Sequence, residues 1–304
     1  MDVSVIIVNF KTSQLIADCV KSIISLTHDV EYEVIIVDNN SEPDFETIIS
    51  QKIPSESQDN FHFISLPENI GFGRANNEGL KIAKGRNILF LNPDTLLLNN
   101  AIKILSEFLD THNEAGACGG NLFDIDKKPT YSYKMQLPGI AWELNELFNN
   151  KLHIGLYGKI SHFYNTGRNP LQVAFITGAD LMVKKQVLDS AGAFSDEFFM
   201  YFEETDLCAR IKRAGWKIYS IPQAHIQHLE SKSFEKTDKW ESELKTALLE
   251  ESRHIYYKRN YGKMKRWYAN FIYDLFLQSR ISLIRNKSKK DYYKLRRKHF
   301  KGKK

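Results

Sequence analysis

The stretch Asn87-Ile88-Leu89-Phe90-Leu91-Asn92-Pro93-Asp94-Thr95 indicates the fold class of this sequence. Its apolar run is too short for a helix and is bounded by polar residues and a proline, which is typical of a buried strand in a mostly parallel sheet. Ligands of open α/β sheets bind outside the carboxyl ends of the strands. We therefore expect Asn92 and Asp94 at that edge, where two oxygen ligands can meet a metal–phosphate group. An Asn-Pro-Asp turn can also do no more than end a strand.

Upstream of this stretch, two more apolar runs predict a βαβ unit. Val3–Val8 and Glu33–Asp38 have the composition of buried strands, and apolar residues recur at helical spacing between them. The crossover between parallel strands of this kind is right-handed. It places Asn9, which follows the first strand, and Asp38, which ends the second, on the same edge of the sheet.

A glycine-containing loop follows the third predicted strand, Phe61–Leu66. Gly71 and Gly73 let the backbone approach a ligand closely, and the next helix offers free amides at its N-terminus. Arg74 adds a cation, so the loop suits a diphosphate. A Gly-x-Gly pair is also compatible with a tight strand-to-helix turn, and the edge that this loop shares with the Asn-Pro-Asp turn favours the ligand-binding interpretation.

Three carboxylates lie close together in the segment from Gly192 to Arg210. They are Glu203, Glu204 and Asp206. Burying all three is costly unless a cation or a substrate makes use of them, so we expect one of them to carry out chemistry. The alternative is a solvated helix start whose acidic residues complement the helix dipole.

The last predicted strand, Trp216–Ile221, is followed by two histidines. His225 and His228 lie three residues apart on an extended chain, so we expect them to face differently and only one to point into the site. His228 is a candidate metal ligand, although a single histidine is more often structural. Between Asp124 and Pro170 the pattern loosens, which predicts a variable segment over the site.

The composition is that of a globular protein. The chain has 304 residues, of which 42% are hydrophobic and 26% charged, enough for one large α/β domain or two smaller ones. It enters a strand directly, with no basic leader and no apolar run of about 20 residues, so we expect a cytoplasmic protein. Cys19, Cys118 and Cys208 are odd in number and far apart, so we expect core residues and neither a disulfide framework nor a metal site.

The segment from Arg253 to Lys304 differs in charge from the rest of the chain. It holds about 18 Lys and Arg but only two acidic residues, whereas the remainder is net acidic. A stripe of apolar residues recurs in it at helical spacing: Tyr268, Phe271, Ile272, Leu275 and Phe276. This pattern predicts a helix that lies in an anionic membrane surface. The alternatives are packing on the rest of the chain or on a second subunit, with a disordered basic end, and nucleic-acid binding.

Together these motifs resemble family 2 glycosyltransferases of the GT-A fold, in particular the branch of bacterial rhamnosyltransferases and galactofuranosyltransferases. The resemblance runs from Val3 to about Ser233, and these segments match in order: Val8-Asn9-Phe10, Val37-Asp38-Asn39-Asn40-Ser41, Asn69-Ile70-Gly71-Phe72-Gly73, Leu91-Asn92-Pro93-Asp94, Thr177-Gly178-Ala179 and Phe194 to Cys208. It implies a Rossmann-like, mostly parallel α/β sheet flanked by helices. It also implies a catalytic domain over 1–233, with a nucleotide-sugar half (1–100) and an acceptor half (101–233). The basic segment that follows (234–304) is expected from its own charge and periodicity to be a helical tail.

Carried over position by position, the resemblance implies a donor site. Asn9 and Asp38 would hold the base and ribose of a nucleotide-sugar. Gly71 and Arg74 would lie near its diphosphate. Asn92 would complete this nucleotide-sugar site.

The resemblance implies a metal and catalytic site beside it. Asp94 corresponds to the metal-binding aspartate of the family's Asp-x-Asp motif, and His228 to a histidine that completes the metal site. Glu204 stands at the position of the catalytic base, next to Glu203. Asn92 departs from the motif by replacing its first Asp, which lowers the charge of the site. Glu204 occurs where Asp is common, so the base reaches about one methylene further.

The expected activity is therefore inverting glycosyl transfer with Mg²⁺ or Mn²⁺ as cofactor. The favoured donor is dTDP-rhamnose, with UDP-sugars next, and the expected acceptor is a glycan, lipid-linked, in cell-surface polysaccharide synthesis. The tail would hold the protein on the inner face of the cytoplasmic membrane; a homodimer is a further option, and no nucleic-acid partner is expected. The alternatives are a non-catalytic nucleotide-sugar or glycan-binding protein, which would not need Glu204, and a nucleotidyltransferase. The latter usually has a Gly-rich, basic first loop, which Val8-Asn9-Phe10-Lys11 lacks.

Overall fold

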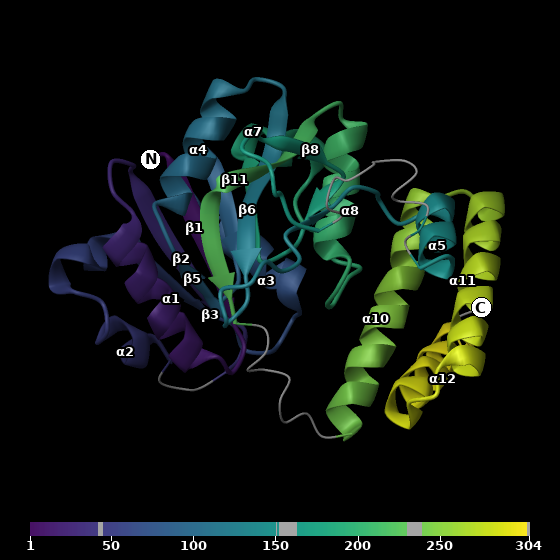
Figure 1. The fold of residues 1–304 in the computed structure, drawn as a ribbon. Helices are drawn as coiled ribbons and strands as arrows, with labels where there is room; N and C mark the ends of the chain where they lie inside the picture. Colours follow the sequence, from purple (N-terminus) through teal and green to yellow (C-terminus); the bar gives the residue numbers. More distant parts are fainter. Residues whose placement is uncertain (42–44, 150, 152–162, 230–238, 303–304) are drawn as a thin grey trace.

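A nine-stranded sheet forms the centre of the computed structural model, which describes residues 1–41, 45–149, 151, 163–229 and 239–302 (Figure 1). In order across the sheet, the strands are β3 (Phe61–Ser65), β2 (Tyr32–Asp38), β1 (Val3–Asn9), β4 (Asn87–Leu91), β10 (Asp180–Lys184), β6 (Ala115–Phe123), β11 (Lys217–His228) and β5 (Thr95–Leu97), with β8 (Leu171–Val173) beside β11. Strands β5, β8 and β10 run against the other six. A smaller sheet pairs β7 (Tyr133–Lys134) with β9 (Phe175–Ile176). The predicted α/β class with a mostly parallel sheet is confirmed.

Helices cover both faces of the large sheet. One face carries α1 (Ser13–Leu26), α2 (Phe45–Ser50) and α4 (Ala101–Thr111); the other carries α3 (Phe72–Leu80), α7 (Lys185–Ala191) and α8 (Glu203–Arg213), and a 3-10 helix, η1 (Ser55–Asn60), precedes β3. Successive side chains of a strand point to opposite faces. Val5 and Ile7 therefore join the core beneath α1, while Ile6 and Val8 join the core beneath α3 and α8. Burial on both faces explains why these strands read as continuous apolar runs.

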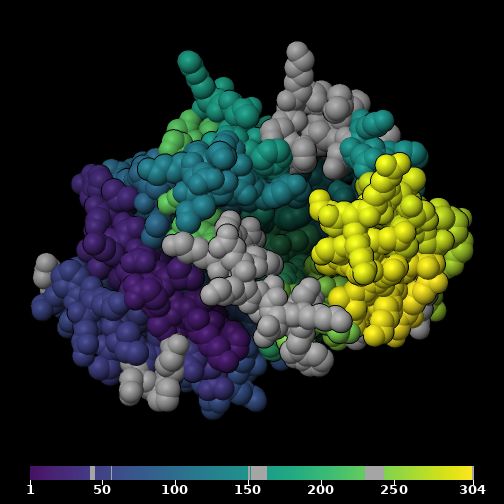
Figure 2. All heavy atoms as spheres, turned by 60° about the horizontal axis from the view of Figure 1, so that its bottom comes forward, coloured from purple at the N-terminus to yellow at the C-terminus, as the bar shows by residue number. Residues whose placement is uncertain are grey.

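The carboxyl ends of β1, β2 and β4 lie at one edge of the sheet. Asn9 is in register with Asp38, and Ile7 is in register with Leu91. The turn after β4 therefore lies beside the Asn9–Asp38 pair, because β1 is parallel to both β2 and β4. Figure 2 brings this lower edge of Figure 1 forward and shows the surface hollowed between the N-terminal part of the chain and the C-terminal helices.

Two segments differ from the predicted elements. β11 extends beyond its predicted end, through Pro222 to His228, and its pairing with β6 is irregular on the way. A proline lacks the N–H of a regular ladder, so this irregularity accommodates it. The segment predicted to be loose contains β7 and a helix, α5 (Ile140–Leu147), although residues 150 and 152–162 lie outside the described part.

Three helices form the C-terminal part: α10 (Lys239–Asn260), α11 (Lys263–Leu283) and α12 (Lys287–Lys301). α10 packs on α8, α11 packs on α5, and α12 packs on both α10 and α11 (Figure 1). The apolar stripe predicted for this segment is divided between two faces of α11, because Phe276 is buried whereas Tyr268, Phe271 and Leu275 are exposed. Within the described ranges, no helix is long and apolar enough to cross a membrane.

Candidate active site

A buried polar pair joins the ends of β1 and β2. The Asn9 amide donates to one carboxylate oxygen of Asp38 at 2.8 Å and to the Ser41 hydroxyl at 3.0 Å. The Ser41 N–H donates to the other Asp38 oxygen at 3.1 Å. Each oxygen of this carboxylate can accept one further hydrogen bond from a ligand hydroxyl. The contacts therefore fix Asp38 at the edge of the sheet as an acceptor.

The Gly71 loop is held between the end of β2 and the segment that precedes α8. Gly71 has a φ of 91°, and a Cβ there would lie 2.4 Å from the Phe199 carbonyl oxygen, so glycine is required. Asn39 donates to the Asn69 side chain and accepts from the N–H of Ile70, both at 2.9 Å. No sequence pattern predicted that Asn39 holds the Gly71 loop in place, because its partners lie about 30 residues away in the chain.

Arg74 lies in the first turn of α3, but its guanidinium contacts the protein. Its Nε donates to the Asp196 carbonyl oxygen at 2.8 Å. Asn77 on the same helix donates to the Phe194 carbonyl oxygen at 2.8 Å and accepts from the Phe194 N–H at 3.1 Å. In this structure α3 thus positions the segment before α8, and the Arg74 guanidinium is directed at that segment.

Asn92, Asp94 and His228 come together where the chain leaves β4 and where β11 ends. A carboxylate oxygen of Asp94 lies 3.2 Å from His228 Nε2, and the Asn92 amide nitrogen lies 3.3 Å from the same ring nitrogen. His225 faces elsewhere, with its ring against Phe123 and its Nε2 3.0 Å from the Pro222 carbonyl oxygen. The different facing of the two histidines therefore agrees with the prediction from their spacing.

The carboxylate of Asp94 and the imidazole of His228 fit a divalent cation that is also bound by a substrate. Their side chains are 13% and 9% exposed, so both are held in place but reachable. The described residues contain no group of three or more His, Cys, Asp or Glu that could hold a metal. Mg²⁺ commonly takes one or two protein carboxylates and completes its shell with substrate phosphates and water. A two-ligand site of this kind suits a cation that arrives with a diphosphate.

A cavity of about 480 Å³ connects this metal-ligand edge with the start of α8. Asn92 and His228 line it together with Glu203 and Glu204. Asn92 lies more than a hundred residues before the two glutamates in the sequence, and His228 lies 24 residues after Glu204, so the fold brings side chains from separate segments into one space. The cavity is large enough for a sugar ring and part of an acceptor.

The backbone before α8 adopts an unusual conformation. Tyr201 and Phe202 both lie in the left-handed region, with φ of 71° and 65°. Bulky residues rarely adopt this conformation, and such strain tends to occur at functional sites. It turns the chain sharply, so that Glu203 and Glu204 begin α8 at the wall of the cavity.

The two adjacent glutamates have different surroundings. Burial raises the pKa of both carboxyls, and the charge of Glu204 raises the pKa of Glu203 further. The Thr205 hydroxyl donates to Glu204 at 3.1 Å, whereas one carboxyl oxygen of Glu203 is buried without a hydrogen-bond partner in the described part of the chain. Glu204 lies beside Gly178, and Glu203 lies beside Gly73 of α3. Both glutamates line the cavity, but their nearest neighbours differ.

Asp206, the third carboxylate of the acidic segment, is structural. It is fully buried and accepts from Arg210 at 2.9 Å, from the Asn260 amide at 2.9 Å and from Arg259 at 3.4 Å. Arg259 and Asn260 belong to α10. The C-terminal helices therefore hold the helix that carries Glu204.

Sequence reasoning missed several residues of the cavity wall. Tyr131 and Trp142 come from the segment that was expected to cover the site, but neither was assigned a role in it. Leu249 comes from α10, and it belongs to none of the sequence motifs that predicted the site. Asp180 on β10, which does not line the cavity, is fully buried, accepts from the Gly120 N–H at 2.5 Å and leaves its other oxygen without a described partner. Burial raises its pKa well above the usual value.

Comparisons with known proteins agree with this geometry. The profile described as Glycosyl transferase family 2 matches residues 4–191, more than half of the chain. The dTDP-rhamnosyl transferase RfbF of Shigella flexneri is 27% identical over 198 residues, 64% of this chain and 59% of that protein. The N-acetylglucosaminyl-diphospho-decaprenol L-rhamnosyltransferase of Mycobacterium tuberculosis is 23% identical over 230 residues, 67% of this chain and 69% of that protein.

A solved structure shows the same fold. GalNAc-T7, whose crystal structure holds UDP, GalNAc and Mn²⁺, has a TM-score of 0.64 at 14% identity, over 100% of this chain and 56% of that one. The GT-A fold predicted from the resemblance is thereby confirmed. The chain spans less than two thirds of the length of RfbF and of GalNAc-T7. It belongs to glycosyl transferase family 2.

Proposed function

We propose that this protein is an inverting glycosyltransferase that transfers a sugar from a nucleotide-sugar to a glycan acceptor in cell-surface polysaccharide synthesis. The observation that carries the proposal is the single cavity that holds Asn92 and His228 together with Glu203 and Glu204. Residues 1–100 would bind the donor, residues 101–233 would bind the acceptor and supply the base, and residues 234–304 would form an attached helical tail.

The donor would lie along the carboxyl ends of β1, β2 and β4. Asp38, fixed by Asn9, would accept from the ribose, and the base would lie over the same edge. The Gly71 loop would bring backbone amides near the diphosphate. Arg74 keeps an electrostatic role there, since a guanidinium has five N–H donors and the Asp196 carbonyl does not engage all of them.

Asp94 and His228, with Asn92 beside them, would hold Mg²⁺ or Mn²⁺. When bound, the cation would neutralise the charge that develops on the departing diphosphate. The Mn²⁺ in the GalNAc-T7 crystal structure supports a divalent metal for this fold. The protein would supply a carboxylate oxygen of Asp94 and the Nε2 of His228, which lie 3.2 Å apart.

Glu204 would act as the general base on the opposite side of the sugar. It would accept the proton of the acceptor hydroxyl while the acceptor oxygen bonds to the anomeric carbon and the bond to the diphosphate breaks, the diphosphate leaving with the electron pair. Attack opposite the leaving group inverts the anomeric configuration. Glu203 would remain protonated, because burial and the charge of Glu204 raise its pKa, and would donate to a hydroxyl of the donor sugar.

The favoured donor is dTDP-rhamnose, with UDP-sugars next. The printed names of RfbF and of the mycobacterial relative, a dTDP-rhamnosyl and an L-rhamnosyl transferase, support rhamnose. The mycobacterial name also supports a lipid-linked acceptor. Such an acceptor would require a protein that works at the inner face of the cytoplasmic membrane, and exposed Tyr268 and Phe271 on α11 provide an apolar surface for that location.

A donor panel tests the proposal. The purified protein is incubated with Mn²⁺, an acceptor extract and each nucleotide-sugar in turn, and release of the free nucleoside diphosphate is followed. We expect release with dTDP-rhamnose that depends on the acceptor. Binding of donors without release from any of them would support the non-catalytic alternative, and release from a UDP-sugar alone would reject rhamnose while retaining glycosyl transfer.

A further inference from the structure

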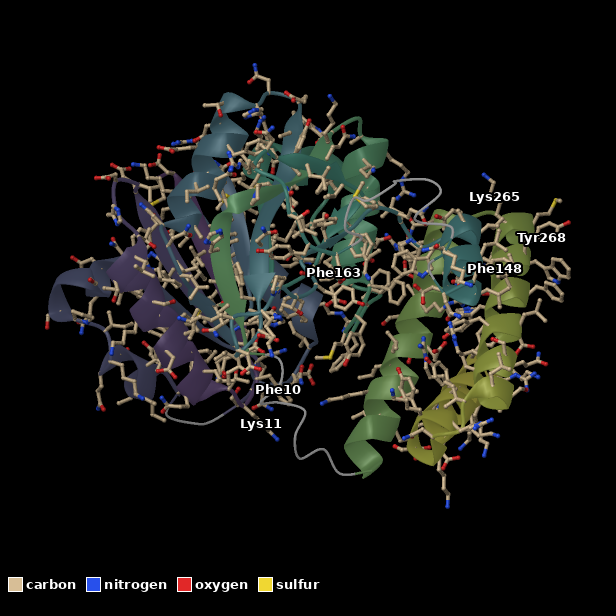
Figure 3. The ribbon with its side chains drawn as sticks, in the orientation of Figure 1. Phe10, Lys11, Phe148, Phe163, Lys265 and Tyr268 are labelled. Atoms are coloured by element: carbon tan, nitrogen blue, oxygen red, sulfur yellow. The ribbon has the colours of Figure 1, made fainter. Side chains whose placement is uncertain are left out.

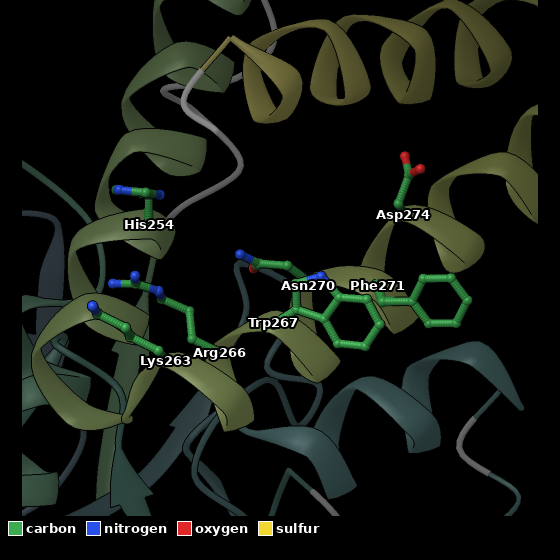
Figure 4. A pocket seen from close by; sticks show the side chains of 7 residues that line it. All are labelled: His254, Lys263, Arg266, Trp267, Asn270, Phe271 and Asp274. Carbon is green, nitrogen blue, oxygen red and sulfur yellow. The ribbon is translucent and has the colours of Figure 1, made fainter.

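A second cavity of about 490 Å³ lies beside α11, apart from the candidate active site. Figure 4 shows His254 of α10 with Lys263 and Arg266 of α11 at one end, and the rings of Trp267 and Phe271 side by side. These two rings are stacked, with centroids 5.7 Å apart and planes within 7°. The cavity therefore combines cations with an aromatic floor.

Two of the basic residues at this cavity, Lys263 and Arg266, carry positive charge toward it. Lys263 and Arg266 form no ion pair with any residue that the structure describes. The acidic residue of the cavity, Asp274, is already bound by Arg297 at 2.7 Å. Asn270 uses its carbonyl oxygen to accept from Arg253 at 3.0 Å, which turns its NH₂ group into a further donor for a ligand. The charges of Lys263 and Arg266 therefore suit an anionic ligand.

The aromatic floor continues into an exposed apolar face of α11. The residues of that face recur at helical spacing and are each at least 40% exposed: Met264, Trp267, Tyr268, Phe271 and Leu275. We call this set the α11 stripe. Lys265 and Tyr268 project outward from the same helix (Figure 3). Aromatic rings with basic neighbours are typical of the headgroup level of a membrane.

We propose that this cavity binds the phosphate headgroup of an anionic phospholipid while the α11 stripe enters the bilayer interface. The charge complementarity of Lys263 and Arg266 selects a phosphate, and the shared rings of Trp267 and Phe271 select one that is attached to a bilayer, because a soluble anion would leave the stripe in water. The inference rests on the membrane location proposed above. The proposal adds a defined binding site for one lipid headgroup to the general attraction between the basic tail and an anionic membrane.

The site also relates the membrane to the chemistry. His254 of this cavity and Leu249 of the active-site cavity lie five residues apart on α10, about 7.5 Å along its axis. A phospholipid bound at one cavity would therefore place the bilayer surface near the other. A lipid-linked acceptor would reach Glu204 without leaving the membrane surface.

The test uses the full chain and short-chain phosphatidylglycerol below its micelle concentration, titrated by calorimetry. Short-chain phosphatidylcholine and inorganic phosphate are the comparison ligands. The test variant is Lys263→Gln with Arg266→Gln; the control is Lys287→Gln with Lys289→Gln, which removes the same charge from the exposed start of α12. Co-sedimentation with phosphatidylglycerol vesicles is measured on the same proteins.

We expect saturable binding of phosphatidylglycerol, weakened about fivefold or more for each cation removed from the cavity and unchanged in the control. Phosphatidylcholine should not bind, and inorganic phosphate should bind more weakly than the lipid. Equal weakening in both variants would show diffuse attraction and overturn the site. Equal binding of inorganic phosphate and lipid would assign the cavity to a soluble anion and overturn it as well. No nucleotide-sugar is present, so these outcomes are independent of the donor panel.

Discussion

Glu203 is a buried carboxyl, and one of its oxygens has no hydrogen-bond partner in the described residues. Ionisation of this side chain should therefore lower the stability of the folded protein. Its pKa in the folded state is raised by burial and by Glu204, so the native state is destabilised as the pH rises through that raised value. Glu203→Gln keeps the shape and removes the charge. We expect the Glu203→Gln variant to have a higher melting temperature than the wild type at alkaline pH. The difference should correspond to about 1–3 kcal/mol in the free energy of unfolding.

The difference should disappear in acid, where the carboxyl is protonated in both the folded and the unfolded states. Thermal unfolding at a series of pH values measures this, with Glu68→Gln as an exposed control. A gain in stability that is the same at every pH would mean that ionisation of Glu203 is not the cause.

His225 and His228 provide a matched pair for the metal assignment, because they share a strand and face different surroundings. We predict that His228→Ala weakens binding of Mn²⁺ in the presence of a nucleoside diphosphate by about 10–100-fold, the loss seen when the ligation of a metal site is disturbed. His225→Ala should bind as the wild type does. Electron paramagnetic resonance of free Mn²⁺ reports the affinity directly, and equal affinities for the two variants would remove His228 from the site.

The residues that could be located from sequence are those that follow buried strands. Asn92 and Asp94 follow β4, and parallel strand ends necessarily meet at one edge, so the sequence pattern was sufficient. Arg74 was not predictable in the same way, because its guanidinium binds a carbonyl 122 residues away in the chain. Likewise, three carboxylates in a short segment look alike in sequence, and only the contacts made by α10 identify Asp206 as structural.

At the scale of elements, a buried ion pair joins α10 to α5. Arg253 is 4% exposed and donates to Glu143 at 2.8 Å, and the Tyr257 hydroxyl donates to the same carboxylate. Removing one partner leaves a buried charge unpaired, so we expect Glu143→Leu to lower the free energy of unfolding by about 3–5 kcal/mol. The double variant Glu143→Leu with Arg253→Met removes both charges and should recover part of that loss.

Denaturant unfolding of the two single variants and the double variant measures the coupling between these residues. A double variant whose destabilisation equals the sum of the single effects would mean that Glu143 and Arg253 do not stabilise each other.

Helices and strands were predictable where the apolar pattern of the segment itself determined the structure. β1, β2 and β4 contain continuous apolar runs because both of their faces are covered, and α4 shows a clear helical period. β11 was predicted too short, since a proline normally ends a strand and only its irregular pairing with β6 accommodates Pro222. α5 was missed because its surroundings, and not its own periodicity, stabilise it: α11 covers it and Arg253 pairs with Glu143.

At the scale of the whole molecule, the chain combines an acidic part, which carries the candidate active site, with a cationic helical part that bears the α11 stripe. We predict that Tyr268→Ser with Leu275→Ser, which alters the stripe without touching the lining of the second cavity, reduces co-sedimentation with anionic vesicles. Attachment of the wild type should also weaken with salt, as charges are screened beyond about 8 Å at physiological ionic strength. Removing the whole tail by truncation near Glu251 would test the membrane role less cleanly, because it would cut through α10.

Light scattering on the same variants separates the membrane interpretation from self-association. If the stripe instead covers a second copy of the chain, the wild type will be a dimer without lipid and the double variant a monomer. Vesicle binding that is unchanged in the variant would contradict the membrane role of the stripe.

The most direct measurement of the proposed chemistry is the rate of sugar transfer by Glu204→Gln, with the donor found in the panel and at saturating acceptor. We predict that kcat falls by about 10²–10⁴-fold while donor affinity is retained, because the amide cannot accept the acceptor proton. Glu204→Asp should keep part of the activity, and wild-type activity should rise with pH through the raised pKa of Glu204. A kcat for Glu204→Gln within a few-fold of the wild-type value would contradict the assignment of this cavity as the site of glycosyl transfer.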